Sequence, residues 1–554
     1  MKRVPLARAA VAALAVLAVA ACGKAAPDTS SSGGGSTAPS TANALSPTTP
    51  APKGDVAGRI TWATYRDVGT IDPIQAFDYP ENTVLTALCD SLLRQAPDGT
   101  MGPGLATITH PDEKTTVITL KDGPKFYDGK AVTADDVLFS LKRAADPKGG
   151  GFYPQVFSRV ASMKKTSDKV VTISLKEPDF WLDGELSQMP GIVVQKAFAE
   201  SKGRKLGTPQ GGLMCAGPYK VGSWKPGSTL NAVRNDDYWD ASHKAKVAEI
   251  DFKGVPDDSS MTSGLLTGGI DGSYVQALST IDQLKAAKDK VSVFEGPSFA
   301  SDAIVLSNLK GALGDVKVRQ ALSLAIDRKA YIQNVYHGGA QLPRTLANPG
   351  TWGYGKDVFQ ADWDKLPDPN PDLAKAKDLM KQAGAAGKTI TLGMTTEVQQ
   401  LNTAANAVRS AGQAIGLTVK FKAVSAQNFI NFFTDPKARE GIDGFPTVNY
   451  PDYADPAAFY NTIVMPDGSQ NYDAYDDPQT TKAMNDARSA ADPVQRAKFV
   501  AQAGDRIMDQ LPWIPMAAVN TTLITSSKLT GAPSSFAYMG GPWANLLGGT
   551  GDGS

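Results

Sequence analysis

The sequence predicts a large α/β protein in which β-strands alternate with α-helices. Segments with strand periodicity, such as Lys388 to Leu392, alternate with segments whose apolar residues recur at helical spacing, such as Asn402 to Ile415. This alternation is typical of a largely parallel sheet covered by helices. The composition is that of a soluble globular protein, with 42% hydrophobic and 20% charged residues in a chain of 554.

The elements can be read in chain order from periodicity and from helix start signals. A helix opens at Thr133, because Thr133 is a good N-cap and Asp136 supplies the acid of a capping box. The other helices are expected at 82–93, 315–328, 373–383 and 402–415. Strands are expected at 58–63, 115–120, 169–175, 388–392 and 417–421.

The N-terminus has the pattern of an export signal. Met1 to Arg8 is short and basic, and the Ala/Val/Leu run from Ala9 to Ala21 is shorter than the roughly 20 apolar residues that span a bilayer. The run ends at Val19-Ala20-Ala21-Cys22-Gly23, which resembles the bacterial lipobox, in which the cysteine is lipidated and becomes the new N-terminus. We expect a lipoprotein signal at 1–22 and a lipid on Cys22. The alternative is an ordinary signal peptide with an incidental cysteine.

The stretch after Cys22 is dominated by Ala, Ser, Thr, Gly and Pro. It has almost no large apolar residues, so it cannot bury enough surface to order itself. We therefore expect residues 23–56 to be a disordered tether that holds the folded part at the outer face of the cell membrane.

The charge balance argues against one class of function, and the cysteine content bears on a disulfide. Lys+Arg and Asp+Glu both number 56, and a neutral chain without a basic patch is a poor candidate for nucleic-acid binding. Cys89 and Cys215 remain once Cys22 carries lipid, and two cysteines in an oxidising compartment pair more often than not. The alternative is two separately buried thiols.

The residues of an enzyme are missing from the sequence. The three histidines do not form a His-Glu-x-x-His motif, and the chain has no Gly-x-Ser-x-Gly elbow and no phosphate loop. Adjacent acids such as Asp135-Asp136 and Asp257-Asp258 fall in turns or helix starts, where solvated carboxylates are ordinary. We expect no catalysis, no cofactor and no metal site.

Several motifs stand in an order that carries a family resemblance. They run from Ile71-Asp72-Pro73 through Phe126-Tyr127-Asp128-Gly129, Ala134-Asp135-Asp136-Val137-Leu138-Phe139-Ser140-Leu141-Lys142-Arg143, Ala216-Gly217-Pro218-Tyr219, Val318-Arg319-Gln320-Ala321-Leu322 and Ala325-Ile326-Asp327-Arg328 to Pro512-Trp513-Ile514-Pro515. Together they resemble the peptide/nickel class of bacterial extracytoplasmic solute-binding proteins, also called family 5. The matches cover about residues 58–520, which is the whole folded chain.

The resemblance implies a two-lobe periplasmic-binding-protein-like α/β fold (class II) with an extra subdomain inserted in lobe I. It places lobe I at 57–95, 213–296 and 517–550, the inserted subdomain at 96–212, and lobe II at 297–516. The family usually has Gly-Thr or a similar pair before Gly-Pro-Tyr, whereas Met214-Cys215-Ala216 stands here. Cys215 and Cys89 then both belong to lobe I, which supports their pairing.

The resemblance also suggests ligand contacts. In peptide-binding relatives an aspartate just before an acid-Pro pair holds the peptide ammonium group, and Asp452 in Pro451-Asp452-Tyr453-Ala454-Asp455-Pro456 fits that pattern. A turn-capping or surface role is the alternative, and Asn449 stands where the family often has tryptophan. Further expected ligand contacts are Thr64, Tyr65, Trp352, Tyr354 and Tyr453. For Trp352 and Tyr354, packing at the base of a loop is an equally good explanation.

The implied function is that of a monomeric extracytoplasmic receptor, anchored by lipid, that captures a solute and delivers it to an ABC permease. Peptide is the solute most often assigned in the family. A receptor for an oligosaccharide or a metal chelate, or a sensory lipoprotein that does not transport, remains an alternative.

Overall fold

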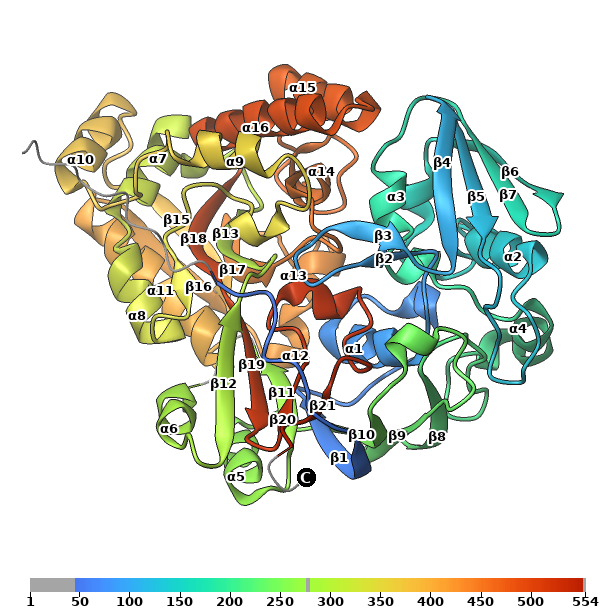
Figure 1. Cartoon of the computed structure of the whole chain (residues 1–554). Coiled ribbons are helices and arrows are strands. Elements are labelled where there is room, and N and C mark those ends of the chain that lie inside the picture. Colours follow the sequence, from blue (N-terminus) through green and yellow to red (C-terminus); the bar gives the residue numbers. More distant parts are fainter. Residues whose placement is uncertain (1–44, 276–278, 552–554) are drawn as a thin grey trace, which may run out of the picture. The chain divides into compact units, whose positions relative to one another are not determined.

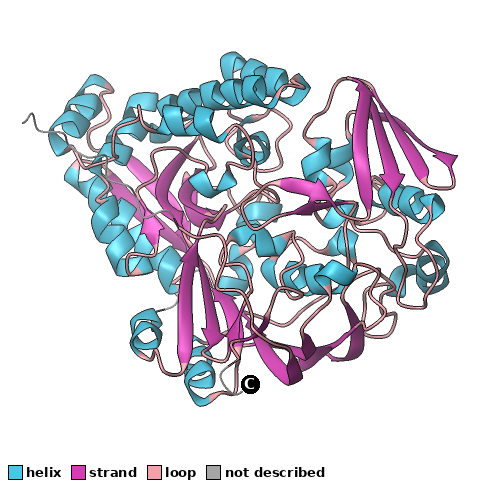
Figure 2. Cartoon of the chain, in the orientation of Figure 1, coloured by secondary structure: helices cyan, strands magenta, loops and turns pink. Residues whose placement is uncertain are grey.

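The computed structural model describes residues 45–275 and 279–551. The predicted signal at 1–22, the lipidation site Cys22 and the part of the predicted tether up to residue 44 lie outside the described residues. The described part has the two-lobe α/β fold expected from the sequence, with helices packed around several sheets (Figure 1). The arrangement of helices and strands is followed most easily in Figure 2.

Lobe I, as named here, is the part built on a seven-stranded sheet of order β12-β19-β11-β1-β10-β9-β8. Strand β1 lies at its centre and buries Ile60 and Trp62, as expected for a run rich in β-formers. The strands of the sheet are β1 (Val56–Thr64), β8 (Tyr219–Lys225), β9 (Thr229–Arg234), β10 (Val247–Gly254), β11 (Gly272–Val275), β12 (Val291–Gly296) and β19 (Thr521–Ser526). Its helices and small strands are α1 (Tyr79–Leu88), α5 (Asp258–Thr267), α6 (Ile281–Ala286), β2 (Leu93–Gln95), β20 (Leu529–Thr530) and β21 (Gly548–Gly549). Strand β2 pairs with β3 (Met101–Pro103), which falls within the bounds expected for the inserted subdomain.

Lobe II is built on a six-stranded sheet of order β14-β18-β13-β17-β15-β16. Its strands are β13 (Ser301–Leu306), β14 (Ala340–Gln341), β15 (Thr389–Met394), β16 (Thr418–Ala423), β17 (Gly444–Asn449) and β18 (Trp513–Val519). Helices that pack on this sheet include α7 (Val316–Ala325), α8 (Arg328–Tyr336) and α11 (Gln399–Ala414), and α10 (Leu373–Gln382) packs on α7. The remaining helices are α9 (Lys356–Trp363), α12 (Ala426–Phe429), α13 (Asn431–Thr434), α14 (Pro456–Val464), α15 (Pro478–Ser489) and α16 (Pro493–Gln510).

The inserted subdomain is built on a four-stranded antiparallel sheet of order β4-β5-β7-β6. Its elements are β4 (Ala106–Asp112), β5 (Thr115–Leu120), β6 (Val160–Ser167), β7 (Val170–Leu175), α2 (Ala134–Ala144), α3 (Leu182–Glu185) and α4 (Lys196–Lys202). Helix α2 begins with the predicted capping box, in which the Thr133 and Asp136 side chains and backbones bond reciprocally. The apolar face of α2 packs on β6 and β7.

Two short segments connect lobe I to lobe II. The first, residues 297–300, joins β12 to β13, and the second is the single residue Asn520 between β18 and β19. Asn520 is held on both sides, because its amide donates to Glu295 at 3.0 Å and its backbone N donates to the Gly339 carbonyl at 3.0 Å. These are the two crossings that the fold class implies.

The prediction of a largely parallel sheet is wrong. Strand β1 pairs in parallel with β10 and β11, and β15 pairs in parallel with β16 and β17, but the other strands of both large sheets pair antiparallel. Hairpin connections such as β8-β9-β10 and the two crossing segments bring strands back in the opposite direction. Strand periodicity carries no information on the direction of the partner strand.

Two predicted helices are shorter than expected. The helix predicted over 82–93 spans Tyr79–Leu88, because Cys89 leaves the helical backbone region, and Leu93 belongs to β2. The helix predicted over 315–328 is two helices, since the backbone turns extended at Ile326 and Asp327 caps the next helix by accepting from Ala330 N.

The predicted disorder of the tether is wrong for residues 45–55, which lie along lobe I. Thr48 forms a β-bridge with Pro533, and the Thr49 hydroxyl donates to the Ala532 carbonyl at 2.8 Å. Lys53 N donates to the Gly549 carbonyl at 2.9 Å. The stretch orders because these bonds to residues 529–549 replace the apolar burial that its composition lacks, a long-range effect that composition cannot reveal.

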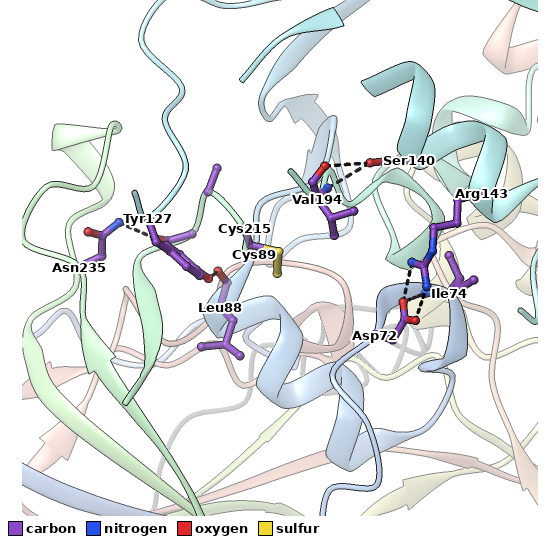
Figure 3. The surroundings of a disulfide bond; sticks show 12 residues. Asp72, Ile74, Leu88, Cys89, Tyr127, Ser140, Arg143, Val194, Cys215 and Asn235 are labelled. Carbon is purple, nitrogen blue, oxygen red and sulfur yellow. Dashed lines mark hydrogen bonds and ion pairs between the residues drawn. A yellow bond between two sulfur atoms is a disulfide. The ribbon is translucent and has the colours of Figure 1, made fainter. Parts of the chain in front are cut away.

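Cys89 and Cys215 form a disulfide, which is the pairing expected (Figure 3). The bond joins the end of α1 to the segment before β8, and the backbone of Gly217 approaches the Leu88 carbonyl so closely that an added Cβ would lie 2.1 Å from it. A side chain at 217 would therefore push the two segments apart.

The family motifs supply a buried polar framework. Arg143 of α2 forms an ion pair with Asp72, which also caps the short helical turn that starts at Pro73 (Figure 3). Arg319 and Arg328 of lobe II are buried and donate to backbone carbonyls of Leu313, at 2.7 Å, and Pro515, at 2.8 Å. These motif residues therefore have structural roles within their own parts of the fold.

Candidate functional site

Asp452 lies in the loop that connects β17 to α14 in lobe II. The helix begins at Pro456 because Asp455 caps it, accepting a hydrogen bond from Ala457 N at 2.8 Å. Asp455 also accepts from the Tyr354 hydroxyl at 3.0 Å. Both bonds reach Oδ1 of Asp455, which gives this buried acid a structural role, whereas the described residues give Asp452 no such role.

Within the described part of the chain, the Asp452 carboxylate has no partner. The side chain is half-buried, and none of the residues that the structure describes forms a hydrogen bond or ion pair with it. The surrounding protein excludes water from the carboxylate and raises the pKa of Asp452 to about 6. A desolvated carboxylate without a partner is costly, so the site favours a bound cation.

A second acid faces Asp452 from the inserted subdomain. Glu185, the last residue of α3, lies close enough that the Asp452 charge adds to burial in raising the pKa of Glu185 well above its usual range. Its Oε2 atom is buried and, among the described residues, has no hydrogen-bond partner. The site thus combines two carboxyl groups on two separate parts of the fold.

Aromatic rings from both lobes line the same region. Tyr450, two residues before Asp452, stacks edge-on against Tyr79 with ring centres 4.8 Å apart, and its ring centre lies 5.0 Å from that of Phe536. The Tyr450 hydroxyl donates to the Phe77 carbonyl at 3.4 Å. The Tyr79 hydroxyl is buried and lacks a partner in the described part of the chain. Rings of this kind offer large contact area at low entropic cost.

Tyr65, a predicted ligand contact, stands at the lobe I edge of this region, with its ring centre 6.5 Å from that of Tyr79. It is 50% exposed, and its hydroxyl donates to Asp78. Asp78 and Glu81 in turn hold the Arg66 guanidinium, with Nη2 2.7 Å from an oxygen of each. Arg66 is therefore a fixed cation, already compensated by two acids, beside an exposed aromatic ring.

The other predicted contacts are used by the fold. Thr64 is buried and its hydroxyl donates to the Arg66 carbonyl at 2.7 Å. Tyr453 is only 4% exposed, and its ring covers Gly184, where an added Cβ would lie 2.3 Å from the ring. Both side chains therefore lie too far inside to offer a free surface to a solute.

Trp352 and Tyr354 are partly buried and pack against the core of lobe II. Trp352 packs on Phe359 and Trp363, with ring centres 6.0 Å away in both cases. The Tyr354 ring contacts Phe359 and its hydroxyl is bound to Asp455. The arrangement matches the packing role that the sequence left open.

Ion pairs and hydrogen bonds join the inserted subdomain to lobe II beside the two carboxyls. Arg488 of α15 forms a bidentate ion pair with Asp179, in which Nε lies 2.8 Å from Oδ1 and Nη2 lies 2.6 Å from Oδ2. Arg159 donates to Asn485 at 2.9 Å. These contacts bring the Glu185 and Asp452 segments together.

A cavity of about 320 Å³ lies away from this region, between the β2-β3 ribbon and residues 533–546 of lobe I. Its walls are mostly apolar and include none of the carboxyl or tyrosine residues described above. Within residues 45–275 and 279–551, no cluster of three or more His, Cys, Asp and Glu residues is arranged to hold a metal ion, and no helix is long and apolar enough to cross a membrane.

Sequence reasoning missed Glu185, Tyr79 and Tyr450. Tyr450 adjoins the Pro451-Asp452 pair, so its place beside the predicted aspartate was a usable signal. Glu185 belongs to no motif, and only the folded chain brings it to Asp452.

The sequence and the fold are similar to those of known binding proteins. The chain is 25% identical to the probable D,D-dipeptide-binding periplasmic protein of Escherichia coli K12, over 84% of this chain and 89% of that protein. It is 25% identical to the periplasmic oligopeptide-binding protein of Salmonella typhimurium, over 81% and 85%. Its fold matches that of a periplasmic binding protein from Helicobacter pylori, solved with the peptide STSA, with a TM-score of 0.75, 21% identity and coverage of 90% and 99%.

The pattern of the bacterial extracellular solute-binding proteins, family 5, matches residues 100–471. Proteins of this family are solute receptors of ABC transporters and not enzymes. Because the match covers more than half of the chain, the protein belongs to family 5 of the bacterial extracellular solute-binding proteins.

Proposed function

We propose that the protein is an extracytoplasmic receptor that captures a peptide between its two lobes and delivers it to the permease of an ABC importer. The observation that carries the proposal is the unpaired, half-buried Asp452 carboxylate in a region lined by tyrosines from both lobes. The peptide ligands named for related proteins in E. coli, S. typhimurium and H. pylori point to the same class.

In this proposal, Asp452 binds the α-ammonium group of the peptide. A charge-assisted hydrogen bond to a desolvated carboxylate is stronger than a neutral one, so a free N-terminus is favoured over a blocked one. Tyr65, Tyr79 and Tyr450 supply the ring surfaces along which the peptide lies.

Closure of the lobes around residues 297–300 and Asn520 commits the ligand. The peptide can favour the closed form only through contacts that it makes better there than in the open form. Asp452 and Tyr450 on lobe II, and Tyr65 and Tyr79 on lobe I, provide such contacts because they lie on opposite sides of the hinge.

We further propose that lipid on Cys22 holds the receptor at the outer face of the cell membrane. The support is the lipobox-like Val19-Ala20-Ala21-Cys22-Gly23. Cells expressing the Cys22→Ser variant should release the protein from the membrane fraction and lose incorporation of labelled palmitate. Membrane retention of this variant would contradict the proposed lipid anchor. It would not bear on the proposal that the protein captures a peptide.

Thermal unfolding of the purified full-length protein against peptides, oligosaccharides and metal chelates tests the ligand class. A ligand that binds only the folded state at a hundredfold excess over Kd stabilises it by about 2.7 kcal/mol. The peptide-induced stabilisation should fall to about half or less on N-acetylation and in Asp452→Asn, because a roughly tenfold weaker Kd lowers the ratio of ligand to Kd by the same factor. The matched control Asp168→Asn, whose side chain is fully solvated, should keep the full stabilisation. A shift with sugars alone would refute the peptide assignment.

A further inference from the structure

Glu185 and Asp452 are held together by a tight contact between their chain neighbours. Gly184 lies flat against the Tyr453 ring, with room for no side chain, since a Cβ there would lie 2.3 Å from the ring. Glu185 and Asp452 are the residues next to this pair, one on the inserted subdomain and one on lobe II. This backbone packing therefore keeps the segments of Glu185 and Asp452 together, and the two acids lie close enough to influence each other's charge.

The charged groups nearby leave the two acids uncompensated. The titratable groups near Glu185 are Asp179, Arg488, Asp452, Asp455, Tyr153 and Tyr453. Arg488 is the cation among them, and its Nε and Nη2 atoms bind the two oxygens of Asp179. Asp455 is held by Ala457 N and the Tyr354 hydroxyl. No described cation is left for Glu185 or Asp452.

Two enclosed carboxyls of this kind are unfavourable without a guest. The Oε2 atom of Glu185 is buried without a partner, and ionising both acids would set two like charges in a region from which water is largely excluded. A bound ammonium group removes both penalties, because it attracts the two carboxylates and offers three hydrogen-bond donors. The fold thus maintains a site that only a cation completes.

We propose that Glu185 is the second carboxylate of the ligand-ammonium site, so that the cationic end of the solute is held between Asp452 and Glu185. The inference rests on the proposed function and assigns a specificity-determining residue to it. It predicts that capture of the cation expels protons, because the empty pair holds protons that the ammonium group displaces. It also predicts a preference for ligands with more positive charge at this end.

Titration calorimetry of the full-length protein at pH 6 to 7, in two buffers of different ionisation enthalpy, tests the proposal. The probes are tri-alanine, Lys-Ala-Ala, N-acetyl-tri-alanine and the non-peptide cation 1,5-diaminopentane. Glu185→Gln should weaken tri-alanine about tenfold or more, the size of one charge-assisted hydrogen bond, and Lys-Ala-Ala further still. It should also lower the number of protons released. The matched control Glu200→Gln, exposed on α4, should change neither quantity.

The outcomes separate this inference from the proposed function. Unchanged affinity and proton release in Glu185→Gln, with peptides binding the wild type, would overturn the role of Glu185 and leave the peptide receptor standing. Binding of 1,5-diaminopentane but not peptides, lost in Glu185→Gln, would support the cation site and refute the peptide. No binding of any cation by the wild type would overturn both. The melting temperature of the empty variant checks that it is folded.

Discussion

Removing the Cys89–Cys215 disulfide should destabilise lobe I. The bond closes a loop with a sequence separation of 126 and joins the end of α1 to the segment that leads into β8. Both sulfurs are buried, so the cleanest change is the double variant Cys89→Ala/Cys215→Ala, which adds no polar group to the interior. The close packing of Gly217 against the Leu88 carbonyl is unchanged in the double variant, so the change removes the covalent link alone.

The size of the effect follows from the loop. The chain-entropy relation for a loop of this length gives about 5 kcal/mol at 25 °C, and native disulfides usually contribute between about 2 and 5 kcal/mol. The free energy of unfolding of lobe I should fall by an amount in that range. Lobe II, which contains neither cysteine, should keep its own stability.

Guanidinium unfolding followed by tryptophan fluorescence measures the change. Trp62 and Trp543 report on lobe I, because their rings lie 4.3 Å apart and the Trp543 indole donates to the Thr83 carbonyl of α1 at 2.9 Å. The wild type in reducing agent should unfold at the same denaturant concentration as the double variant. Equal midpoints for oxidised wild type, reduced wild type and variant would refute the reasoning.

Three further predictions concern the lobe contact and one buried acid. Gly184→Val should force the inserted subdomain away from Tyr453 and weaken peptide binding about tenfold, measured by calorimetry, since an overpacked contact costs about 1–3 kcal/mol; unchanged affinity would contradict it. Arg488→Ala leaves the buried Asp179 carboxylate unpaired and should increase the radius of gyration of the empty protein in X-ray scattering. An unchanged radius would show that this ion pair does not hold the inserted subdomain against lobe II. Burial raises the pKa of Asp302 to about 6, so the folded state keeps a proton that the unfolded chain releases near its ordinary value. The free energy of unfolding should therefore fall by about 3 kcal/mol as pH rises from roughly 4 to 6. Asp302→Asn should remove this pH dependence when unfolding is measured by chemical denaturation. The same pH profile for both proteins would contradict the prediction.

Local chemistry explains the part of the fold that the sequence could predict. The Thr133-Asp136 capping box, the strand at 115–120 and the helix around 402–415 depend on residues close together in the chain. The pairing of β1 with β10 and β11 joins residues 190 and 210 positions apart, such as Ile60 with Ile250 and Trp62 with Gly272. Neither the existence nor the direction of this pairing leaves a periodic trace in the sequence. The order of residues 45–55 depends likewise on partners at the other end of the chain.

The candidate site divides in the same way. Asp452 was suggested by a short pattern before an acid-Pro pair, and Asp455 fulfils the capping role that such a pair favours. Tyr453 could not be recognised as a packing residue, because its ring is buried by Gly184 of a distant segment. The same distant segment carries Glu185, so its place beside Asp452 emerges only when the chain is folded.

A double-mutant cycle between Asp452 and the ligand N-terminus tests the central claim most directly. Affinities of wild type and Asp452→Asn are measured by calorimetry for a free peptide and for its N-acetylated form. The account predicts a coupling free energy of about 1.5 kcal/mol or more, because the cycle isolates the contact between the carboxylate and the ammonium group. Additive losses, with no coupling, would show that Asp452 does not bind the peptide ammonium and would contradict the account.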